Sequence, residues 1–461
     1  MTNGEKNGNG GGAAANGYAV SRTGISFPLQ PPAPPVTLFP SGTPAMREED
    51  DFFSVQRTEF AFVDCRVHDA MPASAITDRS ICYKIHAFDG PEFVFLDEAV
   101  LVMDIKLQDK DGKKPPNNAC VAPIQMFPTT MFRDVRLYLN ETEVSTTEDG
   151  AYPMRAWIET VLNHSPAQLR TNMARYGIVQ DETGDTYQKR DDKAPLAAQG
   201  LRNYFGMVQQ SEELDENGKN KTIFIYYEES QMFFAKLLTN FSNCRRPIIP
   251  GVSIKIELDL SSPDFYLYDY SAAGVEDGKY KLKIESAILA VPYRRMNTEL
   301  YYQLGASLTK TPAFYPMKRM SMKKFTLSKG QQNFTFNDMV LSAKKPDRLL
   351  LAFTPEVWWE EGVKKYPLQS TSVFFEDHGD DVDVKTACKM KSARLTVNSL
   401  NVDPLMSKKW QQLVMGAYHK LIQNLGLERV YDRALPFTYE QFARRNFYLL
   451  FDLTQSGRAY D

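Results

Sequence analysis

Short segments that alternate between apolar and polar residues dominate the chain from about residue 57 onward. In Ile254–Leu260, every second residue is apolar, and Lys255, Glu257 and Asp259 lie between the apolar positions. A period of two is typical of a β-strand with one face in a core and one in water. The same pattern occurs in Leu101–Leu107, Val135–Leu139 and Leu282–Ile288. Residues 57–296 therefore form a first predicted β-sandwich.

A second block with the same alternating pattern follows over residues 297–461. The chain is expected to cross into it near residues 297–316. The strands predicted there are Lys324–Leu327, Asn333–Phe336, Arg348–Phe353, Ser372–Phe375, Ala393–Asn398 and Phe447–Leu453. Strands occur in runs instead of alternating with helices of similar length. This favours an all-β fold of two tandem sandwiches over a doubly wound α/β fold.

Three helices are expected to interrupt the strands. The first carries one apolar stripe at helical spacing, from Met154 to Leu162. The second begins at Ser165, a good N-cap before Pro166, and stops at Gly177. The third spans about residues 407–424 in the second block, and its stripe consists of Trp410, Leu413, Val414, Ala417 and Leu421.

Two long segments lack this patterning. Residues 1–56 are rich in Gly and Asn and contain Pro31–Pro35, so they are predicted to form a flexible arm. The arm is interpreted as a linker, with contact to a neighbouring subunit as the functional alternative. Residues 178–222 are polar and charged and are predicted to form a long loop, which is usually functional or disordered in a compact domain.

Charge and hydropathy narrow the class of protein. The formal net charge is −3 and the isoelectric point is about 6.1. A general nucleic-acid binder would carry a strongly basic domain, so no specific nucleic-acid partner is predicted. Neither a signal segment nor a run near the roughly 18 apolar residues of a membrane helix is visible, so no membrane span is expected.

The cysteines and histidines do not form a recognisable site. The five cysteines are odd in number and far apart, which predicts free buried thiols in a reducing compartment. The five histidines form none of the clustered motifs of metal sites. The acidic segment Glu376–Asp381 around His378 could form a cation loop, but it lacks the calcium-loop spacing and is interpreted as a solvated loop.

No nucleophile elbow, phosphate loop or dinucleotide fingerprint is present in the sequence. Trp358 and Trp359 beside Glu360 and Glu361 are compatible with a sugar subsite, although an aromatic rim with a charged edge is the favoured interpretation. The sequence therefore predicts no catalytic, cofactor-binding or metal-binding residue, and the chain is expected not to be an enzyme.

Short basic clusters lie at the entries of predicted strands. Such residues commonly pair with local acids or discourage edge-to-edge pairing, and contact with a neighbouring subunit is the functional version of the same feature. The clusters are Arg245-Arg246, Arg294-Arg295, Lys318-Arg319 and Lys323-Lys324.

Several stretches in a fixed order carry a family likeness: Phe132–Ser145, Tyr152–Glu159, Arg245–Leu258, Asp264–Leu267, Tyr439–Phe442 and Tyr448–Thr454. In this order and spacing the chain resembles the hexon-like double jelly-roll major capsid proteins, in particular those of Polinton/Maverick elements and adintovirus-like DNA viruses. The resemblance covers roughly residues 90–455 and rests on strand and turn residues.

The resemblance implies a structural protein, with two tandem jelly rolls per subunit and a homotrimer that tiles an icosahedral virion capsid. Assembly would take place in the host cytoplasm or nucleus. Expected partners are further copies of the chain, neighbouring trimers and penton or minor capsid proteins. The arm 1–56 would lie inside the shell, and residues 178–222 would form an outward or inter-subunit loop.

The sequence departs from this pattern at its end. In similar proteins, further strands follow the segment that matches Phe451–Thr454, whereas here the sequence stops at Asp461. The second jelly roll is therefore expected to lack its closing strands. Two alternatives remain open at this point: a carbohydrate-binding or carbohydrate-active β-sandwich, and a domesticated capsid relative that no longer assembles.

Overall fold

The computed structural model describes residues 18–20, 26–28, 61–77, 79–86, 90–116, 121–145, 150–179, 208–214, 220–226, 229–242, 244–269, 280–317, 319–323, 325–327, 334–335, 346–353, 392–397, 400–406, 410–429, 434–444 and 447–454. Residues 1–59 and 60–461 form two units. In the first unit, β1 (Tyr18–Val20) pairs with β2 (Ser26–Pro28) in antiparallel fashion. The remaining description concerns the second unit.

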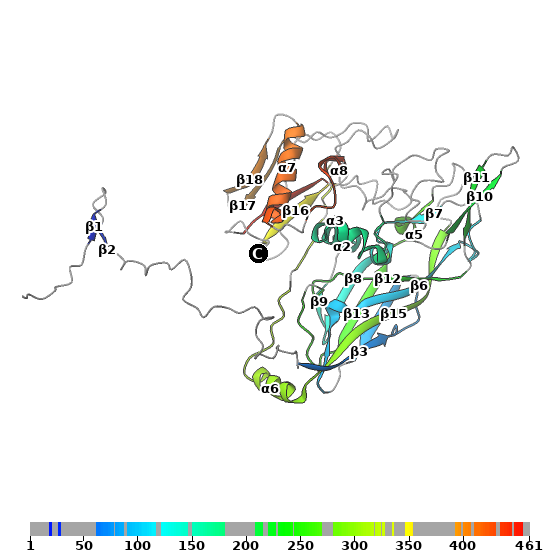
Figure 1. Ribbon diagram of the computed structural model, residues 1–461, viewed down its shortest axis with the longest axis horizontal. Helices are drawn as coiled ribbons and strands as arrows, with labels where there is room; N and C mark the ends of the chain where they lie inside the picture. The colour runs from blue at the N-terminus through cyan, green and yellow to red at the C-terminus, as the bar shows by residue number, and fades with distance from the viewer. Residues whose placement is uncertain are drawn as a thin grey trace, which may run out of the picture. The chain divides into compact units, whose positions relative to one another are not determined.

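One main sheet of the first block is antiparallel and contains its longest strands (Figure 1). Its order is β12-β6-β15-β3, and the short β5 pairs with the far end of β15. The strands are β3 (Phe62–Ala70), β5 (Glu92–Val94), β6 (Val100–Asp109), β12 (Gln231–Ala235) and β15 (Tyr280–Met296).

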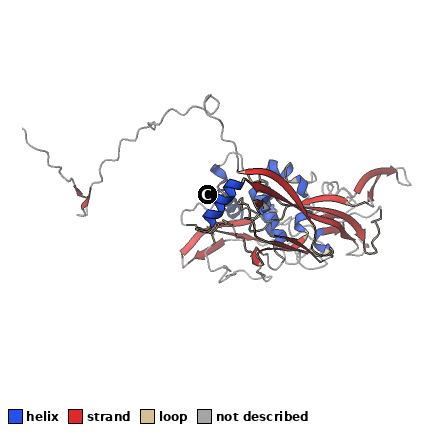
Figure 2. Cartoon of the chain, turned by 90° about the horizontal axis from the view of Figure 1, so that it is seen from below, coloured by secondary structure: helices blue, strands red, loops and turns tan. Residues whose placement is uncertain are grey.

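A second antiparallel sheet has the order β4-β13-β8-β9. Its strands are β4 (Ser80–Ile85), β8 (Phe132–Leu139), β9 (Thr142–Ser145) and β13 (Ile254–Leu260). In Figure 2 the strands of the first block appear as long curved ribbons.

The order of these eight strands defines the fold of the first block. The numbering along the chain from β3 to β15 leaves out the short strands β5, β7 (Val121–Pro123) and β14 (Leu267–Asp269) and the hairpin of β10 (Val208–Leu214) and β11 (Asn220–Tyr226). With this numbering the first sheet reads 1-8-3-6 and the second reads 2-7-4-5. Each sheet thus takes strands from both halves of the block, as in a jelly roll built from two Greek keys. The predicted fold class, mostly β and of the jelly-roll type with short inserted helices, is confirmed.

The core lies between the two sheets, where the apolar residues of the alternating segments meet. Leu101, Met103 and Ile105 of β6 are completely buried, as is Leu258 of β13. The hydroxyl of Tyr83 on β4 donates a hydrogen bond of 3.2 Å to the carbonyl oxygen of Ala287 on β15, which links the sheets. The predicted alternation therefore points its apolar side inward in these strands.

Two of the predicted helices pack on this sandwich. The predicted stripe lies in α2 (Tyr152–Asn163), where Met154 and Ile158 are buried. In α3 (Pro166–Arg170), Ser165 and Gln168 form a reciprocal capping box. The segment stops at Gly177, which has a positive φ of 82° after the short η3 (Ala174–Tyr176). The other short elements of the block are η2 (Leu96–Glu98), β7 (Val121–Pro123), α1 (Phe127–Thr130), α5 (Pro263–Tyr266) and β14 (Leu267–Asp269).

The prediction of a loop over residues 178–222 is wrong in part. Within the part that the structure describes, β10 (Val208–Leu214) and β11 (Asn220–Tyr226) form an antiparallel hairpin. The residues Asn217-Gly218 lie outside the described residues, and their sequence is typical of a hairpin turn. Neither strand alternates between apolar and polar residues, since β10 is polar between its ends and β11 ends in four consecutive apolar or aromatic residues at 223–226. A two-stranded ribbon needs no alternation when its own backbone ladder satisfies the amides and carbonyls.

The crossing between the blocks also differs from the prediction. It begins with a helix, α6 (Thr298–Leu308), which is capped by the Asn297 side chain. The described residues of Lys324–Leu327 and Asn333–Phe336 belong to no strand, so these two predictions are wrong there. Alternation favours a strand, but a strand forms only where another segment offers a backbone ladder.

The described parts of the second block confirm three predicted strands and the long helix. β16 (Arg348–Ala352) pairs with β19 (Tyr448–Asp452), and β17 (Ser392–Val397) pairs with β18 (Leu400–Met406). The other elements are α7 (Trp410–Asn424), η6 (Leu427–Arg429) and α8 (Tyr439–Arg444). Ser372–Phe375 lies outside the described residues, and the domain boundaries and a second complete jelly roll stay predictions.

The helix α7 provides the core of this block. Leu413, Val414, Ala417 and Leu421 of the predicted stripe are buried. The side-chain amide of Asn424 donates a hydrogen bond of 2.8 Å to the carbonyl oxygen of Leu450 in β19, which ties the helix to that strand.

Candidate functional site

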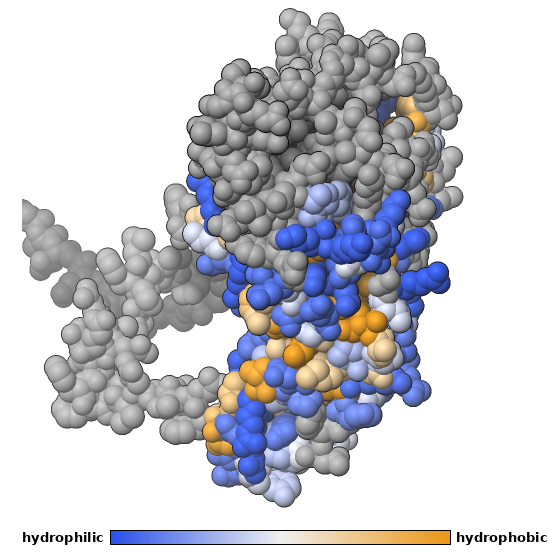
Figure 3. All heavy atoms as spheres, turned by 90° about the vertical axis from the view of Figure 1, so that its right-hand side faces the viewer, coloured by the Kyte–Doolittle hydropathy of each residue, from blue (hydrophilic) through white to orange (hydrophobic). Residues whose placement is uncertain are grey.

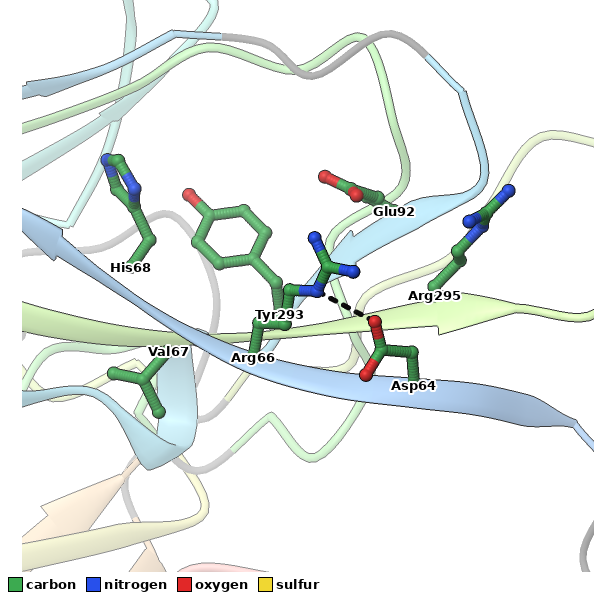
Figure 4. A pocket seen from close by; sticks show the side chains of 7 residues that line it. All are labelled: Asp64, Arg66, Val67, His68, Glu92, Tyr293 and Arg295. Carbon is green, nitrogen blue, oxygen red and sulfur yellow. Dashed lines mark hydrogen bonds and ion pairs between the residues drawn. The ribbon is translucent and has the colours of Figure 1, made fainter.

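A polar cavity lies beside β3 at the edge of the first sheet (Figure 4). Its volume is about 210 Å³, and its residues come from β3, β5 and β15. They are Asp64, Arg66, Val67, His68, Glu92, Tyr293 and Arg295.

The register of β3 against β15 sets the direction of these side chains. His68 pairs with Val291 and Arg66 pairs with Tyr293, and both β15 residues are buried. Side chains of directly paired residues lie on the same face of a sheet. The polar residues of β3 therefore point to the inner face, whereas Figure 4 shows Val67 on the opposite side of the strand.

Charges of both signs meet in this cavity. The Nε atom of Arg66 lies 2.7 Å from Oδ2 of Asp64, and Arg295 and Glu92 are paired residues of neighbouring strands. Burial raises the pKa of the Tyr293 hydroxyl, and the nearby charge of Glu92 acts in the same direction. The phenol is therefore protonated at neutral pH, and the balanced charges fit a polypeptide surface better than a small anion.

The outward faces of the two sheets differ. On the second sheet, the Nη1 atom of Arg136 lies 3.3 Å from Oε2 of Glu257, and Arg136 also pairs with Asp259. The Nζ atom of Lys255 lies 2.6 Å from Oε1 of Glu257. The hydrogen bond from Lys255 lowers the pKa of Glu257 although its burial opposes the shift. The charged side chains on this face therefore pair with one another.

The outward face of the first sheet carries exposed apolar side chains at both edge strands. Val63 and Val67 of β3 are 62% and 61% exposed, and Met232 and Phe234 project from β12 on the opposite edge. Figure 3 shows apolar surface interspersed with hydrophilic residues on the face that it displays. Exposed apolar residues that gather on one sheet face are typical of a contact surface.

The basic clusters were predicted to pair with local acids, and this is confirmed for Arg294. Its Nη2 atom donates to both carboxylate oxygens of Glu98 at 2.8 and 2.7 Å, and its guanidinium group lies 3.9 Å from the centre of the Phe95 ring. Arg246 instead donates to the carbonyl oxygen of Phe314 at 2.6 Å. Lys318 and Lys324 lie outside the described residues.

That carbonyl belongs to an extended linker that follows α6 and lies along the first block. The hydroxyl of Tyr315 donates to the carbonyl oxygen of Pro247 and accepts from the amide of Ile249, both at 3.1 Å. The side chain of Phe314, the residue before Tyr315, is 67% exposed. None of the residues of α6 is buried. The linker is thus fastened at Tyr315 and leaves apolar groups in solvent.

The cysteine prediction is only partly correct. Cys244 is buried, but Cys65 is exposed and Cys82 is half-buried. Cys65 is exposed because β3 is an edge strand whose outer face has no covering layer among the described residues. Cys120 and Cys388 lie outside the described residues.

The structure does not describe the sugar subsite and the cation loop that the sequence suggested as candidates. Trp358, Trp359, Glu360 and Glu361 lie outside the described residues, and so does the acidic segment Glu376–Asp381. Within the described part of the chain, no group of three or more His, Cys, Asp or Glu side chains is arranged to hold a metal ion. No helix there is long and apolar enough to cross a membrane.

Sequence reasoning did not single out β3, although its pattern is informative. Val63, Cys65 and Val67 alternate with polar residues, and this alternation by itself favours the apolar side as the core side. The structure shows the reverse at this strand. An alternating strand whose apolar side faces outward is the signal that marks a surface contact.

Neither models of protein families nor curated protein sequences match the chain. The chain is similar to three solved viral structures. They are the Faustovirus major capsid protein (9% identity, TM-score 0.31, 55% of this chain and 57% of that chain), the Sputnik virophage (11%, 0.34, 56% and 53%) and the mavirus major capsid protein (12%, 0.28, 58% and 53%).

The chain spans slightly more than half of the length of each of these three chains. Two of these three structures bear the name major capsid protein, the class that the sequence resemblance predicted.

Proposed function

We propose that the chain is a major capsid protein, a homotrimeric tile of the icosahedral shell of a Polinton/Maverick-like or related DNA virus. In this role the protein acts through its surfaces, and no residue needs a catalytic function. The virion capsid is the proposed location.

The observation that carries the proposal is the strand order of the first block. Apart from the short β5, the two sheets are ordered 1-8-3-6 and 2-7-4-5 and form a jelly roll, and viral capsid domains are a major use of this architecture. Other proteins, such as lectins and cupins, share it, so the fold alone does not decide the function. The sequence resemblance over roughly residues 90–455 selects the capsid role among them.

The surface of the first block supports a role in assembly. Apolar side chains are exposed at both edges of the first sheet and along the linker, as Val67, Phe234 and Phe314 illustrate. Permanent assemblies bury roughly 2,000–5,000 Å² per interface, with apolar cores. A shell subunit provides partners for these surfaces, whereas a monomeric binding protein leaves them in water.

The remaining parts of the chain receive roles within this proposal. The arm 1–56 contacts penton or minor capsid proteins on the inner side of the shell. The hairpin of β10 and β11 projects from the first block as an outward or inter-subunit contact. Deletion of residues 1–56 should therefore leave the folded subunit intact and impair assembly of shells.

Purified full-length protein tests the proposal. Light scattering coupled to size-exclusion chromatography should give a mass near three times 52.4 kDa, and electron microscopy should show trimers with a pseudo-hexagonal outline or larger arrays. A folded protein that stays monomeric at all accessible concentrations contradicts the proposal and favours a relative that no longer assembles.

A further inference from the structure

The strand β3 has one open edge. It is the last strand of the first sheet and pairs only with β15 among the described residues. Such an edge presents unpaired amides and carbonyls and is a template for the addition of another strand.

The hydrogen-bond directions identify which residues form the open edge. The carbonyl oxygen of Pro292 accepts from the amide of Phe95 at 2.9 Å, so it points away from β3. In an antiparallel sheet, successive residues point their backbone groups alternately to the two neighbouring strands. The residues of β15 that bond to β3 are therefore Val291, Tyr293 and Arg295, whose partners are His68, Arg66 and Asp64.

The backbone groups of the intervening residues face the open edge. These residues are Val63, Cys65, Val67 and Asp69, and all four side chains are exposed. The edge has no proline, no lysine and no bulge in mid-strand, since the only irregularity in its pairing lies at its start, near Met296. Its inward-pointing charges, Asp64 and Arg66, oppose the addition of a strand unless that strand places opposite charges against them. The edge is therefore open to a strand that matches this charge pattern and covers the exposed Val63 and Val67.

We propose that this partner is β3 of a second copy of the chain, paired antiparallel about a two-fold axis with Cys65 opposite Cys65. The two sheets, each of five strands with β5 included, then form one continuous sheet of ten strands. The pairing is isologous, because each residue contacts the same partner position in both directions.

Electrostatic complementarity selects this register. With Cys65 opposite Cys65, Asp64 of each copy lies opposite Arg66 of the other, and Val63 lies opposite Val67. A shift by one residue in each copy places either Arg66 opposite Arg66 or Asp64 opposite Asp64. Like charges directly opposite each other destabilise a strand pair, and opposite charges stabilise it.

The same register suits the backbone and the side chains. The residues opposite each other at Val63, Cys65 and Val67 are the ones with free backbone groups, so each pair exchanges two hydrogen bonds. Asp64 and Arg66 meet at the closer, non-hydrogen-bonded positions, where side-chain pairing is strongest. The two exposed ion pairs within the chains, one in each copy, are thereby exchanged for two ion pairs between the chains.

This inference does not depend on the proposed trimer. A two-fold contact at β3 cannot generate a three-fold assembly, so in a shell it would join subunits of adjacent trimers. Trimers without a β3 contact would contradict this inference and support the proposed function. Dimers formed through β3 without trimers would support this inference and contradict the proposed function.

Oxidative cross-linking of the full-length protein tests the contact through a native residue. Mild oxidation with copper phenanthroline in air should join two chains through Cys65, and peptide mapping by mass spectrometry should locate the bond. Cys65→Ala should abolish this cross-link while the other four cysteines remain. A separation of about 5.5 Å between the Cα atoms of a hydrogen-bonded pair allows a disulfide.

A mixing experiment provides the matched control for register. Val63→Cys and Val67→Cys are each introduced together with Cys65→Ala, and the two proteins are oxidised separately and as a mixture. Only the mixture should cross-link, because position 63 faces position 67 of the other copy. Equal cross-linking by Val67→Cys protein alone, or no Cys65 cross-link in the wild type, overturns the proposal and favours random collision or another occupant of the edge.

Charge exchange supplies an independent measurement of affinity. Arg66→Asp alone, or Asp64→Arg alone, should raise the dissociation constant of the two-fold contact by roughly tenfold, since two favourable pairs become repulsive. An equimolar mixture of the two variants should restore the wild-type value by sedimentation velocity. Equal weakening in the mixture would show that the charges act within one chain, and the proposed register would be wrong.

Discussion

Two adjacent phenylalanines on β12 provide a direct test of the jelly-roll sheet. Phe233 pairs with Met103 on the inner face, is 3% exposed and contacts the Phe127 ring edge-on at 4.8 Å. Phe234 pairs with Val102 on the outer face and is 38% exposed. Replacement of each by alanine removes the same atoms from the same strand, so the two variants differ only in the face that they affect.

The expected magnitudes follow from burial. A buried aromatic side chain removes roughly 150–250 Å² from water, which at about 25 cal/mol per Å² corresponds to about 4–6 kcal/mol as an upper bound. Phe→Ala in a core typically costs about 3–5 kcal/mol. Phe233→Ala should lie in this range, whereas Phe234→Ala should cost about 1–2 kcal/mol, because solvent fills the space that the ring leaves.

Urea unfolding followed by pulse proteolysis measures the difference, with fragments of the first block separated from those of the second. With a slope of about 2 kcal/mol per M, Phe233→Ala should lower the midpoint by about 2 M and Phe234→Ala by less than about 1 M. Similar midpoints, or a lower midpoint for Phe234→Ala, would refute the reasoning. A register shifted by one residue exchanges the two faces of a strand and would give that reversed result.

Three further predictions concern polar contacts. The pKa of Glu257 is lower in the folded protein than its ordinary value near 4.5. Its carboxylate therefore stabilises the fold above that value, and this stabilisation is lost as the pH falls through the lowered pKa. Glu257→Gln should reduce the melting temperature at pH 7, and a difference from wild type that persists unchanged at pH 3 would contradict this. Tyr315→Phe removes the hydroxyl that donates a hydrogen bond to the carbonyl oxygen of Pro247. This variant should accelerate limited proteolysis of the linker several-fold without lowering the melting temperature of the first block. An unchanged cleavage rate would show that other contacts hold the linker. Ser165→Ala removes the capping box of α3 and should cost about 1 kcal/mol in thermal or urea unfolding, with Ser165→Asp as the control that retains a capping oxygen.

The strands that lie in the core could be predicted from the sequence because burial imposes alternation directly. Ile254–Leu260 shows this: the bounds of β13 match the predicted segment. The start of α3 was equally readable, since Ser165 and Pro166 act through local backbone geometry that needs no distant partner.

Elements without an apolar pattern that marks a core could not be predicted in this way. The strands of the hairpin pair with each other but do not alternate, because β10 is polar between its ends and β11 ends in four consecutive apolar or aromatic residues at 223–226. The helix α6 repeats apolar residues at Leu300, Leu304 and Leu308, but none of its residues is buried, so this spacing does not identify a core.

The candidate contact at β3 illustrates the same limit more sharply. Alternation alone would place Val63 and Val67 in the core and Arg66 in solvent. Pairing with the buried Val291 and Tyr293 of β15 fixes the opposite orientation. A strand pattern gives two faces but does not say which one is covered.

By itself the sequence determined the mostly β class, the two blocks of strands and the positions of the principal helices, because side-chain burial and capping are local or periodic properties of the chain. The strand order that makes the first block a jelly roll, the outward turn of the apolar side of β3 and the open edge at Cys65 were decided only by the tertiary structure. These features depend on which strands become neighbours, and neighbours that are far apart in the chain leave no pattern in either segment alone.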